Sequence, residues 1–178
     1  MAQHDDPAVK IVPYDRASPK IFGRLREHLA KVIPHKVQIE HAGSTAIVGL
    51  GGKGIIDILI VTEKEFMDKT MEMLEADGYR PYPEPISEER LFASGTFKYQ
   101  GREVKVHIHM TFSGSSEHKN KLLFRDYLRA HPDEAKNYYD LKKQWSIKAG
   151  PDRPKYSELK TSFINRMLKK AREELDGS

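Results

Sequence analysis

Residues 41–60 read HAGSTAIVGLGGKGIIDILI, and the two halves of this stretch decide the fold. The first half is glycine-rich, with five glycines between residues 43 and 54, so its backbone can adopt angles that side chains would forbid. The second half continues to residue 62 as an almost entirely aliphatic run, which predicts a strand covered on both faces. Asp57 interrupts that run, and a buried carboxylate must be paired, hydrated or bound to a metal.

The glycine-rich segment 43–54 allows two interpretations. Its backbone N–H groups can cradle a phosphate, or the segment can be a tight turn that needs positive φ angles. It is neither a P-loop nor a dinucleotide-binding fingerprint, because Lys53 is followed by Gly54 and no G-x-G-x-x-G motif opens a helix. Asp57 is equally open, since it can serve a functional site, cap backbone amides or pair with Lys53. The candidate phosphate-binding residues are Gly43, Ser44, Thr45 and Lys53.

A second group of polar residues lies in the segment 103–112, EVKVHIHMTF. Its apolar residues alternate with polar ones, so His107 and His109 project from the same face of a strand. Imidazoles at this spacing can coordinate a metal, or they can be a hydrogen-bonded or solvent-facing pair. His41 and Asp57, on other strands, would complete a metal site of mixed His and Asp ligands.

The hydrophobic periodicity of the whole chain predicts an α+β fold. Helices are expected over 21–33, 64–77 and about 118–130, 134–148 and 157–175. Strands are expected over 36–41, 55–62, 91–99 and 103–112, the last two forming a hairpin through Gln100 and Gly101. This order predicts a mixed β-sheet with a helical C-terminal third, in one domain, 1–178, whose ends at 1–10 and 173–178 are loose tails.

Composition excludes several classes of protein. The 178 residues include no cysteine, which excludes disulfides, thiolate metal sites and a cysteine nucleophile. No apolar stretch approaches the ~20 residues of a membrane span and the N-terminus lacks the layout of a signal peptide, so a cytoplasmic protein without membrane contact is expected. Residues 118–178 are basic, with 15 Lys and Arg against 9 Asp and Glu. Such a region can contact phosphates or be a solvated helical surface.

The segment 123–132, LFRDYLRAHP, places Arg125 and Arg129 four residues apart on one helical face, beside Asp126. Arginines suit phosphate or carboxylate recognition, so both are candidate substrate-binding residues. The alternative is an ion pair with a nearby acid. The pairs Lys142-Lys143 and Lys169-Lys170 are expected to be solvated surface.

Four ordered segments resemble the motifs of the GrpB family. EHAGSTAIVGLGGKGIIDILIV (40–61) resembles its signature segment, and the later motifs are matched by HIHM (107–110), LFRDYLRAHP (123–132) and YSELKTSFI (156–164). The likeness extends from about Val12 to Leu168. It implies the nucleotidyltransferase fold, and some members of the family are fused to dephospho-CoA kinase.

The resemblance also implies a site, with departures. In the nucleotidyltransferase superfamily a Gly-Ser turn binds nucleotide phosphates, and a following strand bears two carboxylates, two residues apart, that hold divalent metal. Here 12 residues separate Ser44 from Asp57, which fits, but Leu59 occupies the position of the second carboxylate. The strand expected to supply a third carboxylate offers His107 and His109 instead. Since paired Mg²⁺ ions prefer oxygen ligands, either the metal differs or nucleotidyl transfer has been lost.

The implied function is to bind or act on a nucleotide or another phosphorylated small molecule. The expected catalytic residues are Asp57, His107 and His109, and these with His41 would hold a divalent metal, Mg, Mn or Zn. One alternative, favoured by Leu59, is a non-catalytic ligand-binding or regulatory module. A weaker alternative is an RNA-binding protein, but no aromatic residues are interleaved on an evident sheet face, so nucleic acid is not the expected partner. Val48 and Gly54 stand where the family commonly has prolines, which predicts a looser loop.

Overall fold

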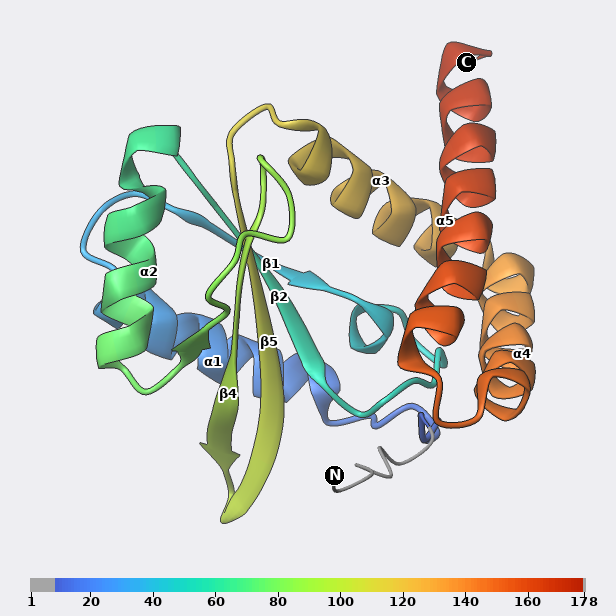
Figure 1. The fold of residues 1–178 in the computed structure, drawn as a ribbon, viewed down its shortest axis with the longest axis horizontal. Coiled ribbons are helices and arrows are strands. Elements are labelled where there is room, and N and C mark those ends of the chain that lie inside the picture. The colour runs from blue at the N-terminus through green and yellow to red at the C-terminus, as the bar shows by residue number, and fades with distance from the viewer. Residues whose placement is uncertain (1–8, 178) are drawn as a thin grey trace, which may run out of the picture.

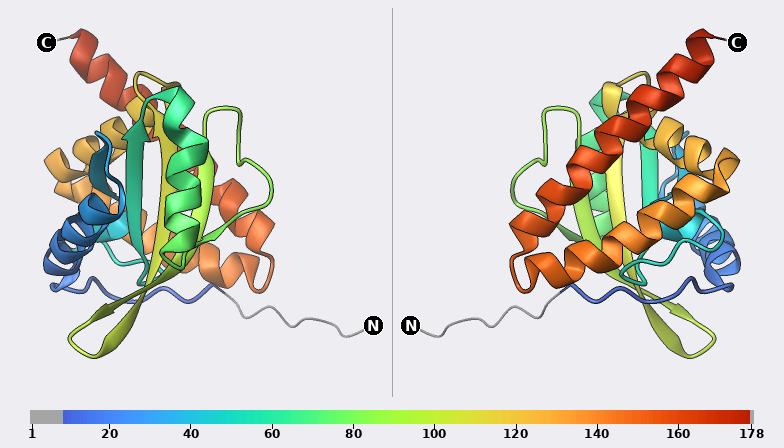
Figure 2. Two further views of the ribbon diagram at one scale, coloured as in Figure 1. Left: turned by 90° about the vertical axis from the view of Figure 1, so that its left-hand side faces the viewer. Right: turned by 90° about the vertical axis from the view of Figure 1, so that its right-hand side faces the viewer.

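A five-stranded mixed sheet separates two layers of helices (Figures 1 and 2). The computed structural model describes residues 9–177. The strands are Gln38–Ala42 (β1), Ile56–Thr62 (β2), Arg80–Pro81 (β3), Leu91–Tyr99 (β4) and Arg102–Phe112 (β5). They lie in the order β1-β2-β5-β4-β3, with β2 parallel to β5 and the other neighbouring pairs antiparallel. The mixed sheet and the helical C-terminal third are as the sequence predicted.

The main core fills the face of the sheet that is covered by α1 (Ser18–Val32) and α2 (Met67–Ala76). Alternate residues of β2 and β5 point to this face, because successive side chains of a strand project to opposite sides. They meet Leu25 and Leu29 of α1 and Leu74 of α2, all of them fully buried. The strand residues in this core are Ile56, Ile58, Ile60, Val104, Val106, Ile108 and Met110.

The opposite face of the sheet meets α3 (Ser116–Ala130), α4 (Pro132–Ala149) and α5 (Arg153–Asp176), which Figure 2 shows on the far side from α2. Its apolar part is small and consists of Ala42, Leu59 and Val61, packed against Leu122. The helices share a separate core, to which the glycine-rich segment 43–54 contributes Ile47 and Leu50. That segment is therefore held between the sheet and the C-terminal helices.

The predicted strands and helices are all present, with shifts at their ends. β2 is interior, flanked by β1 and β5, and is buried along its whole length except at the half-buried Asp57. The β4–β5 hairpin turns through Gln100 and Gly101, whose φ angles of 48° and 79° are those of a tight two-residue turn. Between α2 and β4, Arg80 and Pro81 form the edge strand β3, where a proline costs no sheet hydrogen bond.

Two helices differ from the prediction for identifiable reasons. The segment 64–77 begins as a 3₁₀ turn, η2 (Lys64–Phe66), before α2 starts. α5 begins at residue 153 because the Asp152 side chain accepts a hydrogen bond from the Lys155 N–H (2.9 Å) and because proline is tolerated in the first turn.

The expected loose tails are only partly described. Val9 is buried, and α5 continues to Asp176, so neither position belongs to a loose tail. Residues 1–8 and 178 lie outside the described residues. Among residues 9–177, no helix is both long enough and apolar enough to cross a membrane.

Candidate functional site

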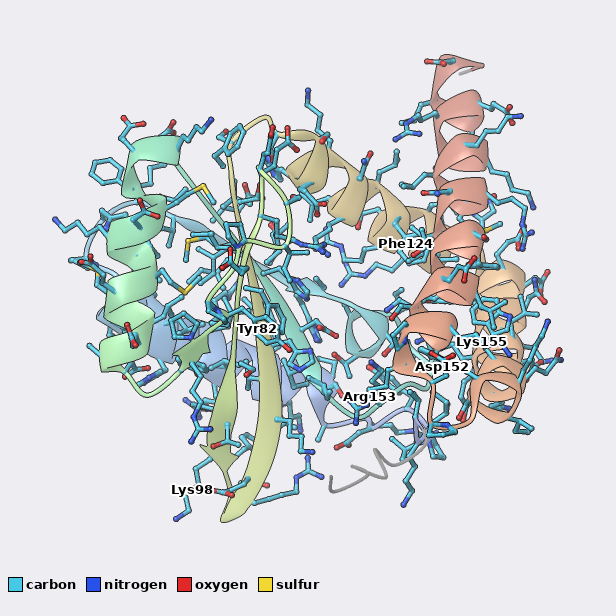
Figure 3. The ribbon with its side chains drawn as sticks, in the orientation of Figure 1. Tyr82, Lys98, Phe124, Asp152, Arg153 and Lys155 are labelled. Atoms are coloured by element: carbon cyan, nitrogen blue, oxygen red, sulfur yellow. The ribbon has the colours of Figure 1, made fainter. Side chains whose placement is uncertain are left out.

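A cavity of about 540 Å³ lies between the second face of the sheet and the C-terminal helices. We call it the polar cavity. Its walls are the glycine-rich segment, β2, β5, α3, α4 and α5. Phe124, which projects from α3 toward α5 in Figure 3, forms part of the wall. The side chains of Asp57, His107 and His109 all open into it.

The strand register brings Asp57 and the two histidines together. Asp57 pairs with His107 across the parallel β2–β5 ladder, and Leu59 pairs with His109. Asp57 Oδ1 lies 3.2 Å from His109 Nε2 and 3.7 Å from His107 Nδ1. The ring of Phe92 on β4 contacts both imidazoles, with centroids 5.0 and 5.2 Å away. The predicted grouping of these three polar side chains on one face is therefore present.

The carboxylate of Asp57 is ionised although it is largely shielded from water. Burial alone would raise its pKa, but the hydrogen bond from His109, the neighbouring His107 and the charge of Lys160 hold the pKa below its ordinary value. Burial and then the charge of Lys121 lower the pKa of His109 to about 4, so this imidazole is neutral at pH 7. Because a carboxylate can only accept, His109 Nε2–H donates to Asp57. His109 Nδ1 has no hydrogen-bond partner among the described residues.

Gly43 allows the turn to approach this carboxylate. Its φ angle is +66°, and a Cβ at this position would lie 2.3 Å from Asp57 Oδ2. Ser44 begins the 3₁₀ turn η1 (Ser44–Ala46) and lines the polar cavity. Gly52 makes room for Ser44, since a Cβ on Gly52 would lie 2.3 Å from Ser44 Oγ. The turn that requires glycine therefore also forms part of the wall of the polar cavity.

Four lysines line the polar cavity, and only one of them was a sequence candidate. They are Lys53, Lys121, Lys142 and Lys160. Among residues 9–177, none of them has a carboxylate within 4.0 Å. Burial is the main cause that lowers the pKa of Lys53, of Lys121 to about 8 and of Lys142 to about 7. Arg90 and Glu117 also line the cavity, but they form an ion pair with each other (3.1 Å), so their charges cancel.

Lys142 corrects the prediction that Lys142 and Lys143 are both solvated. Lys142 is only 5% exposed, while Lys143 is exposed and pairs with Asp140 (3.1 Å). A signal for this was present in the sequence, because Lys142 follows Ala135 and Tyr138 at helical spacing on the buried side of α4. Lys121 and Lys160 carried no comparable signal.

Three predicted site residues lie away from Asp57. His41 is on the opposite face of the sheet, stacked on Phe22 of α1 (ring centroids 4.6 Å apart), and hydrogen-bonds to Thr45 Oγ1 (2.9 Å). Burial lowers the pKa of His41 to about 4. Arg129 donates to the carbonyl of Ala46 (2.8 Å). His41, Thr45 and Arg129 all line a second cavity, of about 730 Å³, so the structure does not bring these three residues to the predicted phosphate and metal site.

Arg125 lines the polar cavity but is engaged in ion pairs. Its guanidinium lies 2.6 Å from Glu40 and 2.7 Å from Asp126, and it also donates to the carbonyl of His41 (3.1 Å). This is the ion-pair alternative to phosphate binding. Arg125 thus ties α3 to β1 at the rim of the cavity.

The donor atoms present do not fit a pair of magnesium ions. Asp57, His107 and His109 lie together, but among residues 9–177 no group of three or more His, Asp or Glu side chains is arranged so that it could hold a metal ion. Leu59, at the position of the second carboxylate, is 0% exposed and belongs to the apolar patch of the sheet. Asp57 is therefore the only carboxylate in the described wall without a lysine or arginine partner, and it faces lysines rather than other acids.

Comparison with known proteins identifies relatives along nearly the whole chain. The YqkA protein of Bacillus subtilis, named UPF0157 protein YqkA, is 35% identical over 96% of this chain, which spans 51% of that relative's length. The crystal structure of conserved protein GrpB from Enterococcus faecalis has a TM-score of 0.77 and 29% identity, covering 93% of this chain and 99% of that one.

A more distant likeness supports the fold class. The Cid1 poly(U) polymerase, in a crystal structure with Mg and 3′-dATP bound, has a TM-score of 0.54 and 15% identity, covering 84% of this chain and 49% of that one. At this identity the likeness concerns the fold alone, and it confirms the predicted nucleotidyltransferase-like core. The family model described as GrpB protein matches residues 8–170. The chain belongs to the GrpB family.

Proposed function

We propose that the polar cavity binds a nucleotide or another phosphorylated small molecule. The observation that carries this proposal is the set of lysines without ion-pair partners around a cavity of about 540 Å³. That volume lies within the ~300–1,000 Å³ of ordinary small-molecule sites. Unpaired ammonium groups at the wall of a cavity favour an anionic ligand, because burying charge without a counter-charge is costly.

The residues of the wall divide into two roles. Ser44 and the lysines would hold and neutralise phosphate oxygens. Asp57 and His107 would lie beside a hydroxyl group of the same ligand or of a second substrate. Burial lowers the pKa of His107, so its imidazole is neutral and able to accept a proton. Such a pair could take a proton from that hydroxyl group during the transfer of a phosphate-containing group.

A second candidate function is a binding module without turnover. The fully buried Leu59 favours it, because nucleotidyl transfer with two metal ions needs a carboxylate where this leucine packs. A divalent metal on Asp57 stays a prediction, and no step of the proposal depends on it.

The first test is a thermal-shift screen of nucleotides, coenzyme A precursors and sugar phosphates, each with EDTA, Mg²⁺, Mn²⁺ or Zn²⁺. A ligand of this class should raise the melting temperature of the wild-type protein, and Lys53→Met should reduce the shift. Lys98→Met is the matched control, since Lys98 lies at the tip of the β4–β5 hairpin, away from the cavity (Figure 3). If no phosphorylated compound shifts the melting temperature under any of these conditions, the proposal is wrong.

The second test separates an enzyme from a binding module. Each ligand that binds is incubated with protein, and its products are followed by phosphorus NMR. Turnover that Asp57→Asn abolishes would support the enzyme, whereas binding without turnover would support the module.

A further inference from the structure

The buried ammonium group of Lys142 has fewer partners than its burial requires. Lys142 Nζ donates to the carbonyl of Gly51 (3.2 Å) and lies 4.5 Å from the centre of the Tyr138 ring. The residue is 5% exposed, and among residues 9–177 it has no carboxylate within ion-pair distance. One carbonyl and one aromatic face do not replace the hydration of a full positive charge. The site around Lys142 is therefore incomplete without an anion.

The position of Lys142 places this incomplete charge beside the Gly-Ser turn. A Cβ on Gly52 would lie 3.3 Å from Lys142 Nζ and 2.3 Å from Ser44 Oγ, so both polar groups lie against this glycine. Both residues line the polar cavity. An oxygen atom of a ligand in this corner would meet an ammonium group from α4 and a hydroxyl group from η1.

The other lysines extend the same positive region. Lys160 acts electrostatically on Lys53, Lys121 and Lys142, and it also lowers the pKa of Asp57. Lys53 Nζ lies over the Tyr156 ring, 5.6 Å from its centre. Four ammonium groups thus share the described wall of the cavity with Asp57, the one carboxylate there that has no lysine or arginine partner. Positive charge is in excess where the fold class ordinarily gathers carboxylates and metal ions.

From this disagreement we propose that the cavity binds a polyphosphate ester through Lys142, Lys53 and Lys160, which neutralise its charge in place of divalent cations. The inference rests on the proposed function and deepens it by naming the ligand class. A chain of two or more phosphates carries enough negative charge to balance the excess of ammonium groups, whereas a monophosphate does not. Lys142 is then a binding residue.

Burial of Lys142 is consistent with this role. Desolvation, followed by the charge of Lys160, lowers its pKa to about 7, so the free protein bears part of the cost of a desolvated ammonium group. An anion placed against Nζ would relieve that cost and hold the proton on the lysine.

The test is isothermal titration calorimetry of the full chain with inorganic tripolyphosphate and with orthophosphate, in EDTA and again in Mg²⁺. Wild-type protein should bind tripolyphosphate in EDTA at least ~10-fold more tightly than orthophosphate, and Lys142→Met should weaken binding at least ~10-fold, as expected for a desolvated charged contact. Lys143→Met, which changes the exposed neighbour, should leave the affinity within ~2-fold of wild type.

Each other outcome overturns the inference or a distinct part of the account. If tripolyphosphate binds only with Mg²⁺, or if Lys142→Met binds as wild type does, the inference is wrong while the proposed function stands. If neither tripolyphosphate nor any compound of the thermal-shift screen binds, the proposed function is wrong as well. Should Lys142→Met fail to fold by near-UV circular dichroism, Lys160→Met replaces it. Its control is the exposed Lys155→Met, and unchanged binding by Lys160→Met overturns the inference in the same way.

Discussion

Arg125 on α3 and Lys142 on α4 are both buried cations in the wall of the polar cavity, yet their surroundings differ. Arg125 is 9% exposed and reaches two carboxylates and a carbonyl, with Glu40 at 2.6 Å and Asp126 at 2.7 Å. Lys142 is 5% exposed, and within the described part of the chain it reaches only the carbonyl of Gly51 and an aromatic ring. Burial and charge are therefore alike, and the presence of counter-charges separates the two.

The pKa values record the same contrast. Burial would lower the pKa of Arg125, but its hydrogen bonds to Asp126 and Glu40 raise it above the ordinary value. No such partner compensates burial at Lys142, whose pKa falls to about 7. A buried cation with its own acids holds the fold together, whereas one without acids is available to a ligand. The following predictions test that distinction.

The largest effect is expected from removing the paired cation. Arg125→Met leaves Glu40 and Asp126 without their partner and should lower the free energy of unfolding by about 2–4 kcal/mol, near the value for a broken buried pair. Chemical denaturation measures this. Lys136→Met is the control, because Lys136 and Asp140 form an exposed pair (3.2 Å), which contributes little to stability. Wild-type stability in Arg125→Met would contradict the structural role.

The next largest effect is expected at the turn of Gly43, which packs against the carboxylate of Asp57. Gly43→Ala forces an alanine to a φ of +66° and a Cβ to 2.3 Å from Asp57 Oδ2, so unfolding should become easier by about 1–3 kcal/mol. Gly23→Ala is the matched control in the middle of α1, where a Cβ would meet nothing within 4 Å. That control should be stabilising by ~0.5–1 kcal/mol. A Gly43→Ala protein as stable as wild type would mean that the turn does not press on the carboxylate.

Removing the unpaired cation should have the opposite sign. Lys142→Met should raise the melting temperature at pH 6 by a few degrees, at ~2–4 °C per kcal/mol for a domain of this size. Because the folded pKa of Lys142 is about 7 and its ordinary pKa is 10.5, its cost to stability is full below pH 7 and vanishes as the pH rises toward 10.5. The advantage of the methionine variant should therefore shrink from pH 6 to pH 10.

The charged groups that act on Lys142 from other elements are Lys160, Asp57 and Lys53, and its ammonium group lies over the ring of Tyr138 on its own helix. Lys143→Met is the matched control, because the ammonium group of Lys143 is exposed and pairs with Asp140. A lower melting temperature for Lys142→Met at pH 6 would instead indicate that the bond to Gly51 is a structural requirement.

The smallest effect concerns the acid among the lysines. Asp57→Asn removes a negative charge from the cavity, so tripolyphosphate in EDTA should bind about two- to fivefold more tightly. Calorimetry on the variant measures this directly. Loss of binding in EDTA would contradict the account.

The sequence predicted those features that depend on local periodicity. The alternation of strand residues is enough to place His107 and His109 on one face of the same strand, and the positive φ of Gly43 is what a glycine-rich turn requires. The sequence could not show which residues of different strands share a face of the sheet. Ala42 of β1 pairs with Asp57, and His41, one residue earlier, therefore projects from the opposite face.

The lysines of the cavity depend on tertiary packing. Lys121, Lys142 and Lys160 come from three helices, and the angles at which those helices pack against the glycine-rich segment are not encoded in any local pattern. Arg125 and Arg129 show the same limit, since a spacing of four on one helix did not bring them to one site. Of the three lysines, only Lys142 could have been predicted from the sequence, from its place on the buried side of α4.

The most direct test of the central claim is a crystal structure of the full chain grown with tripolyphosphate in EDTA. The account predicts phosphate oxygens within hydrogen-bond distance of Lys142 Nζ and of at least one of Lys53 and Lys160, with Arg125 still bound to Glu40 and Asp126. Tripolyphosphate bound at Arg125 or Arg129, with Lys142 still held only by Gly51, would contradict it.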